Sequence, residues 1–380
     1  TSLLDLDRWL EWLPRESEGN GPGLVGFDLR VKRLLAFNRL FHEVEAAGER
    51  RQGILRLRLA GREIAGEVTW ESAGNGRLTA RLARLNIPSD ETLGRDGAGT
   101  PPEERDLPAL DIVAEHFTLN QIPHGRLELL AQPQGGLWRL HKLSLEHPDG
   151  VLTASGQWQR HPGPPRTRLS VDLAVADLGR FASRLKLGEG VRGGSGSVKG
   201  TLEWNGVPYA MDYPTLAGRL TLALDDGQFL EAEPGVAKLL GILSLQALPR
   251  RVALDFTDVF SKGFAFEKIR GEVRLAQGVA HTEALTIEGP SARVSMQGEV
   301  DLARETQNLR VRVMPSLSET AALATGVVGG PVVGLATLAL SKALKDPFGQ
   351  MAAFEYHVAG TWVDPQVTKI PRRIGNLLPP

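Results

Sequence analysis

The sequence predicts a mainly β protein whose sheet is elongated, curved or rolled, and grows along one axis. Apolar and polar residues alternate with a period of two through most of the chain, which is typical of strands that bury one face. A hairpin pattern also recurs, and hairpins that cannot bury an apolar face alone must stack on their neighbours. An ordinary large β-sandwich is the alternative interpretation.

The alternation predicts three sets of strands. The first set comprises residues 27–33, 53–60, 62–71 and 76–85. The second set comprises residues 109–119, 125–132, 137–147 and 150–159. The third set comprises residues 167–175, 196–204, 217–229, 250–256, 263–275, 283–289, 291–302, 308–315 and 352–363. The segment 33–47 is ambiguous between helix and strand, and a pair of strands is favoured.

Helical spacing is confined to residues 3–13, 177–187, 233–248 and an apolar run at 320–341. Stretches rich in Pro, Gly and Asp mark the expected seams, at 88–108 and 160–165. The chain is therefore divided into a first β segment with a short N-terminal helix (1–87), a linker (88–108), a second β-hairpin segment (109–165), a third β segment with a helix at 233–248 (166–315), an apolar helical hairpin (316–346), and a final strand and tail (347–380).

One short phrase marks the repeat: an apolar alternation, then Gly, a polar residue, and Trp or a branched residue. It occurs at Gly156-Gln157-Trp158, Gly298-Glu299-Val300 and Gly360-Thr361-Trp362. The first two lie in a longer shared frame, 143–158 and 285–300, in which a strand, a turn and a second strand reach the Gly at matching offsets. This frame predicts a hairpin that is used more than once.

The run at 320–341 is uncharged and as long as a membrane-spanning helix, which needs ~20 mainly apolar residues. Pro331 after Gly330 favours two short helices with a hinge between them. Three interpretations stay open: a hinged hairpin that enters one leaflet or closes the end of a groove, a buried helix pair, or a full span. In the first, the membrane-contacting side chains are those of Leu323, Val327, Val328, Val332, Val333, Leu335, Leu338 and Leu340.

Composition excludes two classes of protein. Lys+Arg (44) and Asp+Glu (45) nearly balance, whereas a nucleic-acid-binding protein usually shows a strong basic excess. The chain has no Cys, which excludes thiol catalysis and suits an oxidising compartment.

The candidates for chemistry are weak. GEGVRG at 188–193 follows a helix-like segment rather than a strand, so it predicts a turn instead of a phosphate-binding loop. GSGS at 194–197 lacks the nucleophile-elbow pattern, and Asp225-Asp226-Gly227 predicts a hairpin turn instead of a carboxylate dyad. The eight histidines are scattered, at positions 42, 116, 124, 141, 147, 161, 281 and 357. We therefore expect no catalytic residue, metal site or cofactor.

Residues 227–278, the hairpin that ends at 298–302, and residues 313–331 resemble the C-terminal part of the YhdP proteins, members of the AsmA-like envelope superfamily. The resemblance extends to residues 27–70 and 109–158. It implies a Gram-negative envelope protein, held in the inner membrane by an N-terminal helix, whose β-groove carries phospholipids towards the outer membrane. The N-terminus of this chain carries no anchor, so we expect it to be the distal, periplasmic part next to the outer membrane.

On this resemblance the third β segment is the groove, and its apolar strand faces would hold acyl chains, whose burial is driven by area and needs no specific polar partner. The expected lining is formed by Leu220, Leu222, Leu224, Val252, Leu254, Phe256, Phe264, Phe266, Val273, Leu275, Leu285, Ile287, Val294, Met296, Leu309, Val311 and Val313. A dry closed core of the same residues is the alternative.

The expected function is non-enzymatic phospholipid transport between the inner and outer membranes. One alternative is a periplasmic scaffold or assembly factor that holds a protein partner through its sheet edges. A hydrolase acting on envelope glycans or lipids is a third possibility, and it would need a cluster of titratable residues that the sequence does not show.

Overall fold

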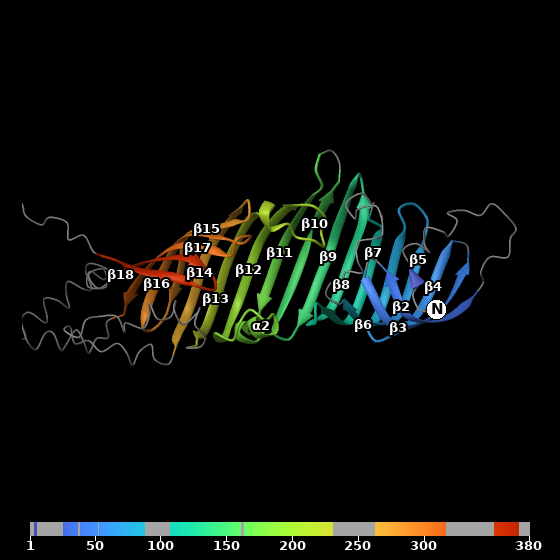
Figure 1. Cartoon of the computed structure of the whole chain (residues 1–380), viewed down its shortest axis with the longest axis horizontal. Coiled ribbons are helices and arrows are strands. Elements are labelled where there is room, and N and C mark those ends of the chain that lie inside the picture. The colour runs from blue at the N-terminus through green and yellow to red at the C-terminus, as the bar shows by residue number, and fades with distance from the viewer. Residues whose placement is uncertain are drawn as a thin grey trace, which may run out of the picture. The chain divides into compact units, whose positions relative to one another are not determined.

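The computed structural model describes residues 4–5, 26–36, 39–51, 53–87, 107–160, 163–230, 263–316 and 353–371. The chain divides into two compact units, the first formed by Thr1–Ala174 with Thr201–Asp212 and the second by Val175–Gly200 with Tyr213–Pro380. Figure 1 labels most of the strands and colours them by residue number. Strands β11 (Arg166–Val175) and β12 (Val191–Asn205) contain points at which the chain passes between the units.

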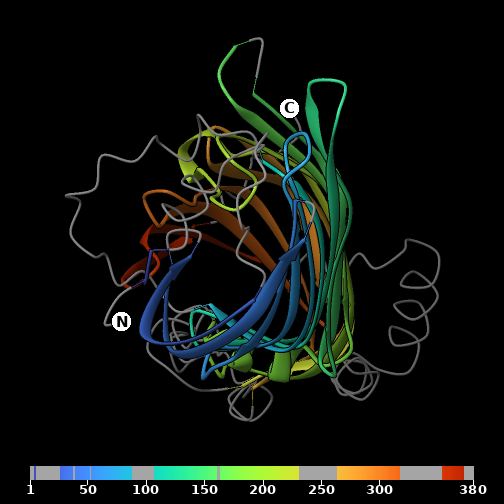
Figure 2. The ribbon, with the colours of Figure 1, turned by 90° about the vertical axis from the view of Figure 1, so that its right-hand side faces the viewer.

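The first unit contains the strands β1 (Leu4–Asp5), β2 (Phe27–Ala36), β3 (Arg39–Arg51), β4 (Ile54–Ala60), β5 (Ile64–Glu71), β6 (Arg77–Ile87), β7 (Ala109–Leu119), β8 (Ile122–Gln134), β9 (Leu137–His147) and β10 (Gly150–Gln159). From β2 to β10 each strand pairs with its neighbours in the chain. The pairs are antiparallel except β1–β2 and β6–β7, which are parallel. Figure 2 shows these strands, coloured blue to green, bending along their length.

The second unit contains β13 (Ala217–Phe229), β14 (Phe264–Ala276), β15 (Val279–Glu288), β16 (Ala292–Asp301), β17 (Thr306–Pro315), β18 (Phe354–Thr361) and β19 (Pro365–Ile370). Every neighbouring pair is antiparallel. Helix α2 (Leu178–Arg184) and the short 3-10 helix η2 (Tyr213–Thr215) also belong to this unit. Among the described strands no pairing joins β2 to β10 or β13 to β19, so the sheet is open.

The structure confirms the mainly β fold class with little helix, and it resolves two local questions. The ambiguous segment 33–47 lies in the antiparallel pair β2–β3, where Leu34 pairs with Phe41. The helical spacing at 177–187 corresponds to α2, which Asp177 caps by accepting a hydrogen bond from the Arg180 backbone N–H at 2.9 Å.

Two sequence-based expectations were wrong, and one strand was not predicted. Leu4 and Asp5, expected in a helix over 3–13, form the strand β1, because Leu4 pairs in parallel with Leu34. Asp225–Gly227 is no hairpin turn: it lies inside β13, where Asp226 takes a φ of 54° and the strand continues. Finally, β19 was missed, because its six residues carry only weak alternation.

Other expectations fall on residues that the structure does not describe. These are the linker at 88–106, the helix at 233–248, the strand at 250–256 and the apolar hairpin at 317–346. The division into six segments therefore remains a prediction.

The expected hairpin repeat is present and keeps its register. In β9–β10, Leu145 pairs with Leu152, and at the same offset in β15–β16, Ile287 pairs with Val294. The two hairpins also share one irregularity, since two residues of the first strand oppose one residue of the second just before Gly156 and just before Gly298. Such a bulge bends a strand and increases its twist.

The repeated glycine has a steric reason. A Cβ on Gly156 would lie 2.1 Å from the carbonyl oxygen of Arg168, and a Cβ on Gly298 would lie 2.3 Å from that of Asn308. Gly298 also has a φ of 134°, whereas Gly156 has no positive φ. The phrase Gly-polar-Trp or Gly-polar-Val thus marks the place where the next strand approaches the bulge too closely for any side chain.

Three Gly→Ala variants should separate backbone strain from close contact. Gly135 has a φ of 60°, and no atom lies within 4 Å of the position that a Cβ would take, so Gly135→Ala should cost about 1 kcal/mol in free energy of unfolding. In Gly156→Ala the new Cβ would be too close to a carbonyl oxygen but the backbone is unstrained, so the loss in free energy of unfolding should be about 1–3 kcal/mol. Gly298→Ala combines the close contact with the positive φ and should lose the most. Denaturant unfolding measures the three; equal losses for Gly135→Ala and Gly298→Ala would contradict the contact explanation.

Candidate functional site

One face of the second unit carries rows of apolar side chains that stay in register from strand to strand; we call it the apolar face. Residues directly opposite each other in neighbouring strands point to the same side of a sheet. The longest row crosses six strands and consists of Leu224, Ile269, Ile287, Val294, Val313 and Phe354. The next row contains Leu285, Met296, Val311 and Tyr356. The sequence therefore builds a continuous apolar strip across the strands.

The structure brings most of the expected groove residues together. Leu224, Phe264, Phe266, Ile287, Val294, Val311 and Val313 are buried in one cluster, against which Leu285, Met296 and Leu309 pack. Leu220 and Leu222 lie partly buried on β13, opposite Val273 and Gly271, and Leu275 is buried on β14. Val252, Leu254 and Phe256 lie outside the described residues.

Phe264 and Phe266 join this cluster because the alternation of buried and exposed positions along β14 shifts by one residue. Ile269 is also buried, three positions after Phe266, so the buried positions shift by one between them. The shift lies opposite Asp226, the residue with positive φ. Phe266 packs there against Phe229, with 5.1 Å between the ring centroids. At the Asp-Asp-Gly motif the strand therefore continues, but the side chains that point to the apolar face change from one set of alternate residues to the other.

The first unit has the same kind of face, which the sequence-based set of lining residues missed. One row runs without a break from β2 to β10 and consists of Leu29, Ala46, Leu59, Gly66, Leu82, Ala114, Leu127, Leu145 and Leu152. A parallel row consists of Phe27, Gly48, Leu57, Val68, Ala80, Ile112, Leu129, Leu143 and Ala154. The alternation in 53–60 and 125–132 indicates which of these residues share a face within one strand, but the pairing was needed to join them into rows.

The apolar face of the first unit is only partly covered at its centre. Leu129 and Leu143 oppose each other in the middle of β8 and β9, yet both are only partly buried. Val68 and Ile112, in the same row, are also partly buried. In a sheet packed against a second layer, large aliphatic side chains at mid-strand would be among the most fully buried. This face therefore leaves aliphatic surface in contact with solvent.

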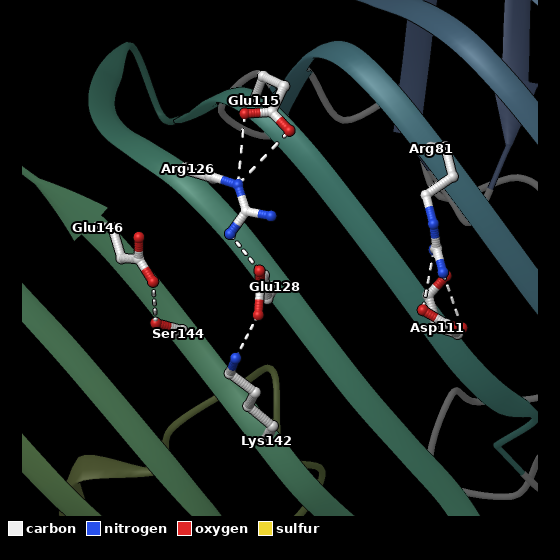
Figure 3. Close-up of polar contacts among 8 residues, drawn as sticks. All are labelled: Arg81, Asp111, Glu115, Arg126, Glu128, Lys142, Ser144 and Glu146. Atoms are coloured by element: carbon white, nitrogen blue, oxygen red, sulfur yellow. Dashed lines mark hydrogen bonds and ion pairs between the residues drawn. The ribbon is translucent and has the colours of Figure 1, made fainter.

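The opposite face is polar and compensates its charges locally (Figure 3). The carboxylate of Glu128 accepts hydrogen bonds from Arg126 and Lys142, and Arg126 also contacts Glu115 at 3.3 Å. These bonds, with that from Lys142 the largest cause, lower the pKa of Glu128. In the second unit a row of alternating charge crosses the strands as Asp225, Lys268, Glu288 and Arg293. Such a face is solvated and leaves apolar ligands to the other side.

Three histidines of the described strands and turns contact acidic side chains. They make separate pairs with single carboxylates, which are His42–Glu63 at 3.2 Å, His147–Asp149 at 2.8 Å and His281–Glu299 at 3.5 Å. In the described part of the chain no three His, Asp or Glu side chains are grouped so that they could hold a metal ion. No helix there combines the length and the apolar character that crossing a membrane requires.

Comparison with known proteins identifies the family of the chain. A curated relative from Escherichia coli (strain K12), named "Intermembrane phospholipid transporter YhdP", is 34% identical over 223 residues, which are 58% of this chain and 18% of the relative. No solved structure matches the chain. The model of the family described as "YhdP protein" matches residues 1–367. The chain therefore belongs to the YhdP protein family.

Proposed function

We propose that this chain is one segment of a phospholipid conduit, in which acyl chains lie against the apolar faces of both units. The observation that carries the proposal is the unbroken register of apolar side chains across β2–β10, on a face whose central leucines are only partly buried. A row of this kind offers equivalent contacts at every strand, and neighbouring strands lie ~4.8 Å apart. An acyl chain can therefore shift along the row without losing contact area.

The energetics suit transport better than tight binding. Apolar contact stabilises a bound acyl chain by about 0.8 kcal/mol per buried CH₂ group, without directional bonds. Apart from the phenol of Tyr356, the side chains in the rows named above carry no polar group, so movement along most of each row requires no strong bond to break. Under this proposal the chain is non-enzymatic, because movement of a lipid along an apolar wall needs no general acid or base.

The relative supports the substrate and the setting. Its name describes phospholipid transport between membranes, and the matched part is 18% of its length, so the complete activity would require more than the matched segment. We propose that this chain acts in the periplasm, in a protein attached to the inner membrane, and that its C-terminal end faces the outer membrane. Leu323, Val328 and Leu335 are among the side chains proposed to contact that membrane.

A second candidate is a scaffold that holds a protein partner by strand addition, since the ladders of both units are open. Strand addition uses the backbone at a sheet edge and leaves the apolar face unused. The two functions therefore differ in which residues touch the partner.

Photo-crosslinking should locate the lipid. Leu129 is partly buried on the apolar face of β8, and its neighbour Leu130 is 44% exposed on the opposite face. A photoreactive residue at Leu129 should capture phospholipid during expression in a Gram-negative host, and one at Leu130 should not, as detected by mass spectrometry. Leu222 and Thr221 on β13 provide the same comparison in the second unit. Capture of protein alone at Leu129 would favour the scaffold.

A charge on the apolar face should block the path. Leu129→Glu places a carboxylate among Leu127, Ile112 and Leu143, and should cost about 1–3 kcal/mol of folding free energy while sharply reducing co-purified lipid. Leu130→Glu is the matched control, because it lies between Asp111 and Lys142, whose charges offset each other. It should change stability by less than about 0.5 kcal/mol. Circular dichroism and native mass spectrometry measure both effects; equal lipid content in the two variants would overturn the conduit.

A further inference from the structure

One position breaks the apolar rows of the second unit. Lys369 in β19 pairs with Tyr356 in β18, and so extends the row that contains Met296 and Val311. The other β19 residues on that face are Pro365 and Val367, which pair with Gly360 and Val358. Within the apolar rows named for this unit Lys369 is the one charged side chain, and it lies on the last described strand.

The Lys369 side chain lies over the apolar face, next to the ring of Phe354. Its ammonium nitrogen lies 4.8 Å from the centroid of the Phe354 ring, a cation–π contact that orients the charge over the apolar strip. Phe354 belongs to the longest row, opposite Val313. Lys369 is exposed, and its ammonium group carries three N–H donors with which it can bind an anion.

We propose that Lys369, with Tyr356 beside it, binds the phosphate of a phospholipid whose acyl chains lie on the apolar face, and so forms a headgroup site at the last described strand. The inference rests on the proposed conduit and adds a place where the lipid is recognised by its charge. Lysine binds phosphate as a point charge through strong charge-assisted hydrogen bonds. Tyr356 is 9% exposed, and burial raises the pKa of its phenol, so the phenol stays protonated and places no negative charge beside the phosphate.

A structural role for the lysine makes a different prediction. Lysines on outer strands also discourage sheets from pairing edge to edge, and a charge of either sign on either face can do this. Recognition of phosphate requires a positive charge on the apolar face. Lys369→Glu therefore separates the roles, because it keeps a charge on β19 and reverses its sign.

The experiment compares two lipids that differ only by a phosphate. The purified full chain is incubated in mixed micelles with equal amounts of phosphatidic acid and diacylglycerol that carry the same acyl chains, and bound lipid is counted by native mass spectrometry. The wild type should prefer phosphatidic acid. Lys369→Gln and Lys369→Glu should lower this preference about tenfold, the effect of losing one charged hydrogen bond, and Lys369→Arg should retain it.

Lys268→Gln is the control, since it removes a lysine from the polar face of β14, where Lys268 pairs with Glu288; it should leave the preference unchanged. A Lys369→Glu protein that keeps the preference overturns the headgroup site and makes Lys369 an edge residue. A wild type that binds both lipids equally also overturns it, while the conduit stands. A wild type that binds neither lipid overturns both proposals.

Discussion

The constraint on which this structure depends is the constancy of strand register. A shift by one residue between two neighbours would move a whole set of side chains to the opposite face, and the apolar strip would be cut at that point. From β2 to β10 no such cut occurs: Leu82 still opposes Ala114 across the parallel pair β6–β7, and Leu127 opposes Leu145 further on. Bulges such as those before Gly156 and Gly298 bend the strands locally, while the apolar and polar faces remain distinct.

The sequence was informative where its signal is local. Period-two alternation placed most strands, and the Gly-polar-Trp phrase identified a hairpin that recurs with the same register and the same bulge at Gly156 and Gly298. Alternation reports which residues share a face within one strand, but it contains no information on which residue of the next strand lies opposite. The rows through Leu59 and Leu129 therefore emerged only from the pairing, although their strands had been predicted.

The errors have related causes. Asp-Asp-Gly is a frequent turn signal because Asp and Gly tolerate positive φ, and Asp226 does take a φ of 54°. Tertiary pairing decided that this conformation turns the face of β13 instead of ending it, because Asp225 and Gly227 both find partners in β14. Lys369 was overlooked for a similar reason: a lysine in a short polar strand is unremarkable until its pairing with Tyr356 places it on the apolar face.

The two faces divide the physical work between them. Charges on the polar face neutralise one another across strands, as Glu288 and Arg293 do at 3.0 Å. In the proposed conduit, a uniform apolar row would give a lipid no preferred position, which would favour movement but provide no place to stop. The proposed headgroup site at Lys369, on the last described strand of the second unit, would supply that place. Movement and recognition would then depend on different residues, and a substitution could impair one of them without the other.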